Sequence, residues 1–308
     1  PYSGWDRLRR RCRRLRGRTF VLGHRYQRPY APFVPAAVVT GAGGGIGLAT
    51  ARRLAARGYA VHVTDVDGAA ATRAAEEIGG PAWSAELDVT DADACRTAAA
   101  AAAERGGLAV WVNNAGLLVP GVVDEQDPAA HRAMLEVNAV GTFNGTLAAL
   151  GLMRSAGSGH VINIISMAGL VAAPGEVAYA ASKHAAMAFT RGTRYDLRHA
   201  GVKEIHVSAV CPDGVWSAMI DGKLDDPNAA ASFSGTMLMP DQVAERVEGL
   251  LDRPRPLITI PRWRGAVIRI FDAFPSVMTR ALPVMLKDAQ RRQRGFKRRV
   301  EEGTWPPS

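Results

Sequence analysis

The chain has 308 residues, 47% of them hydrophobic, and a formal net charge of +9, so it can bury a sizeable core without disulfide or metal staples. Its three cysteines, Cys12, Cys95 and Cys211, lie far apart without paired spacing, which argues against a disulfide framework or zinc cluster and fits a reducing compartment. No long apolar run suited to a membrane-spanning helix is present, and no signal-peptide core follows the basic N-terminus.

The positive charge lies at the two ends of the chain. Residues 1–33 and residues 253–308 each carry a net charge of +9, whereas residues 34–252 carry −9. In the first segment, Arg7–Arg18 holds eight arginines with apolar residues between them. This basic N-terminal extension is interpreted either as a solvated, partly disordered tail or as a basic amphipathic helix at an anionic membrane or partner surface. It lacks interleaved aromatic residues, so no nucleic-acid partner is expected.

From Ala36 onward, short β-branched runs alternate with longer Ala-rich segments, which is typical of repeated strand–helix units. The predicted strands are Ala36–Thr40, Ala60–Asp65, Ala82–Leu87, Val110–Asn113, His160–Ile165, Glu204–Val210 and Leu257–Ile260. The predicted helices are Ile46–Arg57, Gly68–Ile78, Asp91–Arg105, Asp127–Ala156, Glu176–Ala200 and Pro240–Leu251. Several strands are apolar on both faces, as in a parallel sheet covered by helices on both sides. Residues 34–260 are therefore predicted to form one doubly wound α/β domain of the Rossmann type, with about seven parallel strands.

The first predicted strand is followed directly by a glycine-rich turn and a helix. The turn reads Thr40-Gly41-Ala42-Gly43-Gly44-Gly45-Ile46-Gly47. Glycines at this position let the backbone approach a pyrophosphate, whose charge is met by the amides of the helix N-terminus. Asp65 ends the second strand, where a carboxylate can accept hydrogen bonds from both ribose hydroxyls of an adenosine and would repel a 2′-phosphate. The cofactor is therefore expected to be NAD, with NADP as the alternative.

Five further motifs occur in one order and spacing. They are Asp88 in Leu87-Asp88-Val89-Thr90, Asn113-Asn114-Ala115-Gly116, Asn138 in Glu136-Val137-Asn138, Ser166 after the fifth strand, and Tyr179-Ala180-Ala181-Ser182-Lys183. Together with the Thr-Gly-x-x-x-Gly-x-Gly turn, this set resembles the short-chain dehydrogenase/reductase family over residues 36 to about 260. The resemblance implies an NAD(P)-dependent enzyme that interconverts an alcohol and a ketone or aldehyde. Its catalytic residues are then Asn138, Ser166, Tyr179 and Lys183.

The glycine turn and the resemblance together predict the cofactor contacts. These are Thr40, Gly41, Gly45, Ile46, Gly47, Asp65, Asp88, Val89, Asn114, Ala115, Gly116, Tyr179, Lys183, Pro212, Val215 and Ser217. One position departs from the family pattern, because Asp213 follows Pro212 where the family usually has Gly. The Val215 amide is still expected to meet the nicotinamide carboxamide, and Ser217 replaces the usual Thr.

Tyr179 and Lys183 are four residues apart, which puts both side chains on one face of a helix. The Lys183 ammonium is expected to lower the pKa of the Tyr179 phenol and to bond the nicotinamide ribose. Ser166 is expected to hold the substrate oxygen. The resemblance gives Asn138 the role of anchoring a water in a proton relay to Lys183. No pair of histidines has ligand spacing with an acid, so no metal is expected.

Two segments outside these motifs bear on the substrate. Residues 215–239, with Met219, Met237 and Met239, are predicted to form a mobile substrate loop with a short helix. Residues 261–308 are predicted to form a basic extension of about two amphipathic helices, broken at Pro275, whose apolar faces pack over the substrate pocket, on a second subunit or against lipid. A lipophilic alcohol or ketone is therefore the expected substrate.

The alternatives are an NADPH-dependent ketoacyl-type reductase and a non-catalytic nucleotide-binding or membrane scaffold. The family resemblance suggests a homodimer or homotetramer through the helices at 127–156 and 176–200. The expected location is the cytoplasm, with peripheral membrane contact through the basic ends as a further hypothesis.

Overall fold

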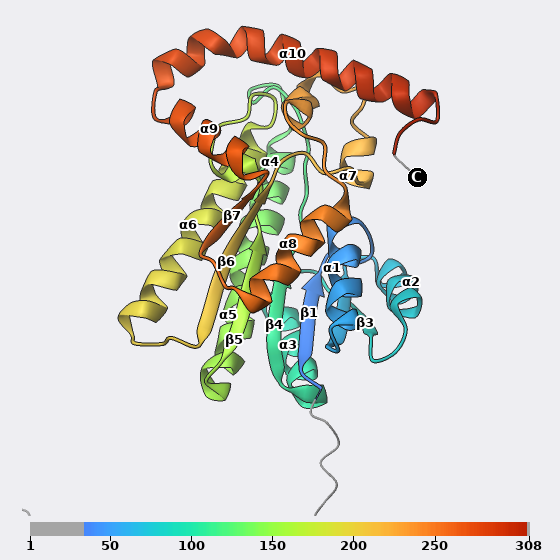
Figure 1. Cartoon of the computed structure of the whole chain (residues 1–308), viewed down its shortest axis with the longest axis vertical. Helices are drawn as coiled ribbons and strands as arrows, with labels where there is room; N and C mark the ends of the chain where they lie inside the picture. The colour runs from blue at the N-terminus through green and yellow to red at the C-terminus, as the bar shows by residue number, and fades with distance from the viewer. Residues whose placement is uncertain (1–33, 307–308) are drawn as a thin grey trace, which may run out of the picture. The chain divides into compact units, whose positions relative to one another are not determined.

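The computed structural model describes residues 34–306. The basic segment 1–33, with Cys12 and the arginine cluster, lies outside the described residues, so its interpretations stay predictions. The strands are β1 (Ala36–Thr40), β2 (Ala60–Asp65), β3 (Trp83–Glu86), β4 (Leu108–Asn113), β5 (Gly159–Ile164), β6 (Ile205–Pro212) and β7 (Leu257–Ile260). They form a parallel sheet in the order β3-β2-β1-β4-β5-β6-β7 (Figure 1). The predicted doubly wound parallel fold is confirmed.

Helices cover both faces of this sheet, as the doubly apolar strands require. On one face, α1 (Gly45–Ala56), α2 (Gly68–Ile78) and α8 (Pro240–Asp252) bury their apolar sides. On the other face lie α3 (Ala92–Gly106), α5 (Gly141–Ala156) and α6 (Val177–His199). The strand order reverses between β1 and β4, and in doubly wound sheets ligands bind beyond the carboxyl ends of the strands at such a point.

The predicted helix Asp127–Ala156 is the largest departure from the sequence prediction. It consists of α4 (Pro128–Leu135), a π-helical turn at Glu136–Val140 and α5. The spacing of apolar residues along this helix does not reveal the π-helical turn. The turn adds one residue to a single helical turn and barely changes that spacing. π-Helical turns of this kind often occur at functional sites, and this one contains Asn138.

A buried chain of side-chain amides and hydroxyls joins the central strands to the helices behind them. Asn113 Oδ1 accepts from Trp111 Nε1 at 2.7 Å, and Asn113 Nδ2 donates to Thr146 Oγ1 at 3.0 Å and Asn163 Oδ1 at 2.8 Å. Asn163 Nδ2 in turn donates to Thr190 Oγ1 on α6 at 2.8 Å. Each buried polar group here has a partner, so the network adds specificity without leaving an unpaired donor.

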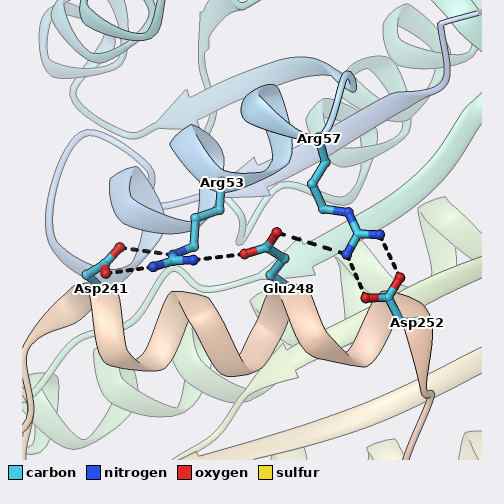
Figure 2. Close-up of polar contacts among 5 residues, drawn as sticks. All are labelled: Arg53, Arg57, Asp241, Glu248 and Asp252. Atoms are coloured by element: carbon cyan, nitrogen blue, oxygen red, sulfur yellow. Dashed lines mark hydrogen bonds and ion pairs between the residues drawn. The ribbon is translucent and has the colours of Figure 1, made fainter.

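Arg53 of α1 and Arg57, the residue that follows α1, form ion pairs with α8 at the surface (Figure 2). Arg53 forms a bidentate pair with Asp241 at 2.7 and 2.9 Å and also contacts Glu248 at 2.9 Å, while Arg57 pairs with Asp252 at 2.6 Å. Partly exposed pairs of this kind contribute about 0–1 kcal/mol each. They link the helix that follows the glycine turn to the helix that follows the substrate loop.

Beyond β7 the chain forms α9 (Arg262–Asp272) and α10 (Pro275–Glu301), here called the C-terminal roof. The predicted break at Pro275 separates these two helices, because α10 begins at that residue. Figure 1 shows α10 running across the carboxyl-end edge of the sheet, above the short helix α7 (Ala218–Asp221). None of the helices between residues 34 and 306 has the length and apolar character needed to cross a bilayer.

Two glycines of α5 provide a test of the packing behind Asn113. A Cβ at Gly145 would overlap Asn113 Oδ1 and lie 2.6 Å from Trp111 Nε1, whereas a Cβ at Gly151 would meet nothing within 4 Å. We expect Gly145→Ala to destabilise the protein by about 1–3 kcal/mol through overpacking. Gly151→Ala on the same helix should stabilise it by about 0.5–1 kcal/mol. Urea unfolding measures both free energies, and equal effects would contradict the close packing at Gly145.

Candidate active site

A cavity of about 710 Å³ opens at the carboxyl ends of the strands, beside the point where the strand order reverses. It is lined by the glycine turn, the ends of β2, β4, β5 and β6, the first turns of α6, the loop after β6 and the C-terminal roof. Within residues 34–306, no group of three His, Cys, Asp or Glu side chains is placed to hold a metal ion. The wall of the cavity carries hydroxyl, amine and carboxyl groups, among them those of Ser166, Tyr179, Lys183 and Asp65.

The glycine turn has the backbone conformation that its sequence requires. Gly41 and Gly45 have φ values of +61° and +54°, which side chains rarely adopt. A Cβ at Gly47 would overlap the Gly41 carbonyl. Asn114 fastens the turn, because its Nδ2 donates to the carbonyls of Thr40 at 3.0 Å and Gly41 at 2.8 Å. The turn therefore leads the N-terminus of α1 to the cavity, where a phosphate group could be met by backbone amides.

Asp65 ends β2 at the edge of the same cavity. Its Oδ2 accepts from the Gly43 amide at 2.9 Å, and its Oδ1 accepts from the Asp67 amide at 3.1 Å. Among the described residues that line the cavity, the only cationic side chains are Lys183 and Arg264. Neither lies against Asp65, since Lys183 contacts β5 and Arg264 is paired elsewhere. Among the described residues, Asp65 therefore has no cationic side chain beside it in the cavity wall that could bind a phosphate.

Asn138 is linked to the backbone of Tyr179 through the Ser182 hydroxyl, and Lys183 is bonded separately to the end of β5. Asn138 Nδ2 donates to the Leu117 carbonyl at 2.8 Å and to Ser182 Oγ at 3.0 Å, and Ser182 Oγ donates to the Tyr179 carbonyl at 2.7 Å. Lys183 Nζ donates to the Ile164 carbonyl at 3.2 Å and lies 5.7 Å from the centre of the Tyr179 ring. The π-helical turn thus holds the start of α6 through a fully bonded amide.

The pKa values of this group correct one expectation. Burial raises the pKa of Tyr179, and the Ser166 side chain only partly opposes that shift. Burial also lowers the pKa of Lys183 to about 8. The predicted lowering of the Tyr179 pKa by the Lys183 ammonium is therefore wrong, because burial is the largest effect on the pKa of both groups and shifts each toward its neutral form.

Most of the residues predicted for the site line this one cavity. The predicted residues in its wall are Gly41, Gly45, Ile46, Asp65, Asp88, Val89, Asn114, Ala115, Gly116, Ser166, Tyr179, Lys183, Pro212, Val215 and Ser217. Thr40, Gly47 and Asn138 lie behind the wall. Thr40 Oγ1 accepts from the Asn114 amide at 3.0 Å, which ties the end of β1 to β4. Cys211 is fully buried under the site, and burial raises its pKa to about 12, as suits a small core residue.

Asp213, the departure from the family pattern, has a partner that sequence reasoning missed. Its Oδ2 lies 2.7 Å from Arg264 Nε of α9 and accepts from the Thr236 amide at 3.0 Å. Arg264 Nη2 donates to Ser234 Oγ at 2.7 Å. A Cβ at Gly235 would overlap the Asp213 carboxylate. The buried pair therefore joins the end of β6, the substrate loop and the roof. These residues are distant in the sequence and meet only in the folded chain.

The roof closes the cavity with apolar side chains. Its apolar contribution to the wall consists of Ile268 on α9 and Met278, Leu282, Met285, Leu286 and Ala289 on α10. Further along α10, Gln293 Nε2 donates to the carbonyls of Lys223 at 2.9 Å and Asp226 at 2.7 Å. The roof is thus bonded to the substrate loop at both ends. The apolar faces of these helices are predicted to pack over the pocket, on a second subunit or against lipid. The inner face packs over the pocket.

Glu176 is a second residue of the site that sequence reasoning missed. It precedes α6, is 3% exposed and lines the cavity. Its Oε1 accepts from the Ser232 hydroxyl at 2.6 Å and the Ser232 amide at 3.1 Å, in the helical turn Pro227–Phe233 of the substrate loop. Burial raises the pKa of Glu176 to about 7, although these hydrogen bonds oppose the shift. An acid three residues before Tyr179 was the only available signal.

Comparison with known proteins agrees with this geometry. The family model described as short chain dehydrogenase matches residues 35–228. The chain is 34% identical over 248 residues to cis-4-hydroxycyclohexanecarboxylate dehydrogenase of Sinomonas cyclohexanicum, covering 78% of this chain and 96% of that protein. It is 35% identical to a protein of Xanthobacter autotrophicus named inactive 2-(S)-hydroxypropyl-CoM dehydrogenase 2, covering 68% of this chain and 94% of that one. A short chain dehydrogenase/reductase from Burkholderia phymatum, solved in complex with NAD, aligns with a TM-score of 0.70 at 28% identity, covering 77% of this chain and 92% of that one.

The raised pKa of Glu176 predicts a pH-dependent effect of its removal. The folded protein keeps the Glu176 proton up to a pH of about 7, whereas an unshifted Glu carboxyl loses it near pH 4.5. Wild-type stability therefore falls as the pH rises through the window between these two values. Glu176→Gln cannot ionise, so its unfolding free energy relative to wild type should rise across the window by about 3 kcal/mol and level off above it. Urea unfolding at several pH values measures the difference. The same change at exposed Glu125 is the control, and two parallel pH profiles would refute the shift.

Proposed function

Because the chain belongs to the short-chain dehydrogenase family, we propose that it uses NAD to interconvert a neutral, hydrophobic secondary alcohol and its ketone. Proteins of this family are NAD(P)-dependent oxidoreductases that act on CH–OH groups. The observation that carries the proposal is that Ser166, Tyr179 and Lys183 line the same cavity as the glycine turn and Asp65. A hydroxyl-bearing substrate and a dinucleotide would therefore meet in one chamber.

The walls of the cavity fit a dinucleotide. The close approach at Gly47 and the positive φ values of Gly41 and Gly45 leave room for phosphate groups at the N-terminus of α1. Asp65 would hold the adenosine ribose, and the absence of a cation beside it among the described residues supports NAD over NADP. Asp88 and Val89 would border the adenine, and Lys183, Pro212, Val215 and Ser217 would border the nicotinamide half. When bound, the nicotinamide supplies the hydride chemistry.

The proton chemistry falls to the side chains of the cavity. Tyr179 would donate its phenolic proton to the carbonyl oxygen in ketone reduction and accept a proton in alcohol oxidation. Ser166 would donate a hydrogen bond that holds the substrate oxygen against Tyr179. Lys183, with a pKa of about 8, is mainly an ammonium at neutral pH and can pass a proton toward Tyr179. Asn138 would position the start of α6, and the relay water assigned to it stays a prediction.

The surroundings of the reacting groups support a neutral, apolar substrate. The substrate end of the cavity is walled by the apolar side chains of the roof together with Met219 and Ile220. Arg264 is 17% exposed, but its charge is matched by Asp213 at 2.7 Å. Among the described residues of the wall, no unpaired cation other than Lys183 is present to bind a substrate carboxylate. The Sinomonas relative, cis-4-hydroxycyclohexanecarboxylate dehydrogenase, is named for a hydroxy acid. The substrate class proposed for this chain therefore differs from the one in that name.

Two alternatives follow from the same family. An NADPH-dependent ketoacyl-type reductase would need a phosphate-binding cation near Asp65, and the described residues provide none in the wall. A non-catalytic scaffold has a precedent in the relative named as inactive, but the Ser166, Tyr179 and Lys183 set is complete here.

Exposed apolar residues on the helices proposed as its interface support a homodimer or homotetramer. These are Leu135, Val140, Leu147 and Val177.

The cofactor is tested by calorimetric titration with NADH and with NADPH. We expect tighter NADH binding, because Asp65 accepts from ribose hydroxyls and repels a 2′-phosphate. Asp65→Ala should narrow the preference by about tenfold or more, since one lost charged hydrogen bond is worth about 1.5–3 kcal/mol. Asp67→Ala, which removes a carboxylate two residues away, is the matched control. An unchanged preference in Asp65→Ala would remove the basis for NAD, and no binding of either cofactor would favour the scaffold.

The substrate class is tested by comparing 4-alkylcyclohexanols with 4-hydroxycyclohexanecarboxylate under NAD. The neutral alcohols should show the higher kcat/KM, because the Arg264 charge is already matched by Asp213. Asp213→Asn should narrow the difference by freeing Arg264 for a carboxylate. Tyr179→Phe should lower turnover of every substrate by about 10²–10⁴-fold while NADH binding persists.

Tyr195→Phe makes the same change on the exposed side of α6 and should leave turnover intact. Preferential turnover of the hydroxy acid by the wild type would contradict the substrate class. Unchanged turnover in Tyr179→Phe would contradict the proposed acid.

A further inference from the structure

The outer face of the roof carries a row of exposed apolar side chains. Trp263, Val267, Ile270 and Phe274 recur at intervals of four, three and four residues, so they lie along one face of α9 and its corner with α10. Trp263 is 59% exposed, Ile270 61% and Phe274 59%. Val277, at the start of α10, adds a further exposed apolar side chain. We call Trp263, Val267, Ile270, Phe274 and Val277 the outer stripe.

The outer stripe is not needed to cover the core of the domain. The opposite side of α9 provides the packing, because Gly265 sits against Thr259 of β7 and Ile268 faces the cavity. Met278 and Leu282 of α10 also face the cavity. The two helices are therefore apolar on two sides, and only the inner side is covered by the described residues. Contiguous exposed apolar surface of this kind marks a site of interaction.

Basic side chains flank the outer stripe. Arg262, Arg269, Arg280 and Lys287 are exposed, and none forms an ion pair within residues 34–306. Between residues 262 and 287 the sequence has a single acid, Asp272. A second copy of this chain would bring like charges together at this face. An anionic lipid surface would instead meet both the charge and the apolar side chains.

We propose that α9 and the start of α10 dock on the surface of an anionic phospholipid bilayer, with the outer stripe inserted among the acyl chains and the flanking arginines at the headgroups. Trp263 suits the interface, because indole rings prefer the boundary between headgroups and acyl chains. Long basic side chains such as Arg269 and Arg280 can extend their charged ends toward the headgroups. The docking needs no structural change within the domain.

The docking face lies on the same helices that line the cavity, so docking would place the cavity beside the bilayer. This inference about substrate access rests on the proposed function. The helices that would touch the bilayer are the same two that line the cavity with Ile268, Met278 and Leu282. A lipophilic alcohol dissolved in the bilayer would then reach the cavity along the roof. Vesicle binding itself does not depend on turnover, so the two proposals fail separately.

The test is flotation of the full chain with vesicles of phosphatidylcholine and with vesicles of phosphatidylcholine and phosphatidylglycerol. We expect binding to the second kind, and a drop in partitioning of at least about tenfold in the double variant Ile270→Asp/Phe274→Asp, which loses two inserted apolar side chains. The matched control is Val122→Asp/Val123→Asp, which adds the same charge at two exposed valines outside the cavity wall. Residues 1–33 are present in every variant, so their charge cannot produce a difference between the two pairs.

A second readout locates the insertion. Vesicles with brominated acyl chains should quench the tryptophan emission of the wild type, and Trp263→Phe should remove most of that quenching while flotation persists. NADH titration of every variant verifies that it is folded. Equal flotation of the two double variants, or quenching that survives Trp263→Phe, would overturn the proposal. A shift from dimer to monomer in Ile270→Asp/Phe274→Asp without a change in flotation would also overturn it and assign the face to a second copy.

Discussion

The arrangement of the active-site elements depends on the buried amide chain that begins at Asn113. This side chain bonds Thr146 on α5 and Asn163 on β5, and Asn163 bonds Thr190 on α6. The elements that it connects include those that bring Ser166, Tyr179 and Lys183 to the cavity. An unpaired buried donor or acceptor in this chain would cost about 1–3 kcal/mol. The network therefore holds β4 and β5 against α5 and α6, the elements around the site.

The wall of the cavity comes from two regions of the chain, one inside the family match and one beyond it. The family match covers residues 35–228 and contains the glycine turn and the Ser166, Tyr179 and Lys183 set. The roof lies outside that match, yet it supplies apolar side chains to the wall of the cavity. Asp213 joins the two regions through Arg264. The family match thus covers the residues on which the proposed reaction type rests, whereas the proposed substrate class rests on a segment outside that match.

The parts of the molecule that sequence reasoning could predict are those governed by local pattern. Apolar runs between Ala-rich segments located the strands, and the glycine spacing located the turn at the end of β1, because both signals act within a few residues. The π-helical turn at Asn138 was missed because one extra residue barely changes the helical period. The pairs Asp213–Arg264 and Glu176–Ser232 were missed because each joins positions about fifty residues apart. Only the folded chain shows that these groups share one cavity.

The spacing of Tyr179 and Lys183 predicts that the ammonium lowers the pKa of the phenol. Burial dominates instead, because it raises the pKa of Tyr179 and lowers the pKa of Lys183. A neutral phenol is the form that ketone reduction requires, since it can donate its proton to the developing alkoxide. Alcohol oxidation requires Tyr179 to give up that proton first, against the cost of burying a phenolate. In the proposed reaction, ketone reduction therefore starts from the protonated form of Tyr179 that burial favours, whereas alcohol oxidation has to form the phenolate that burial disfavours.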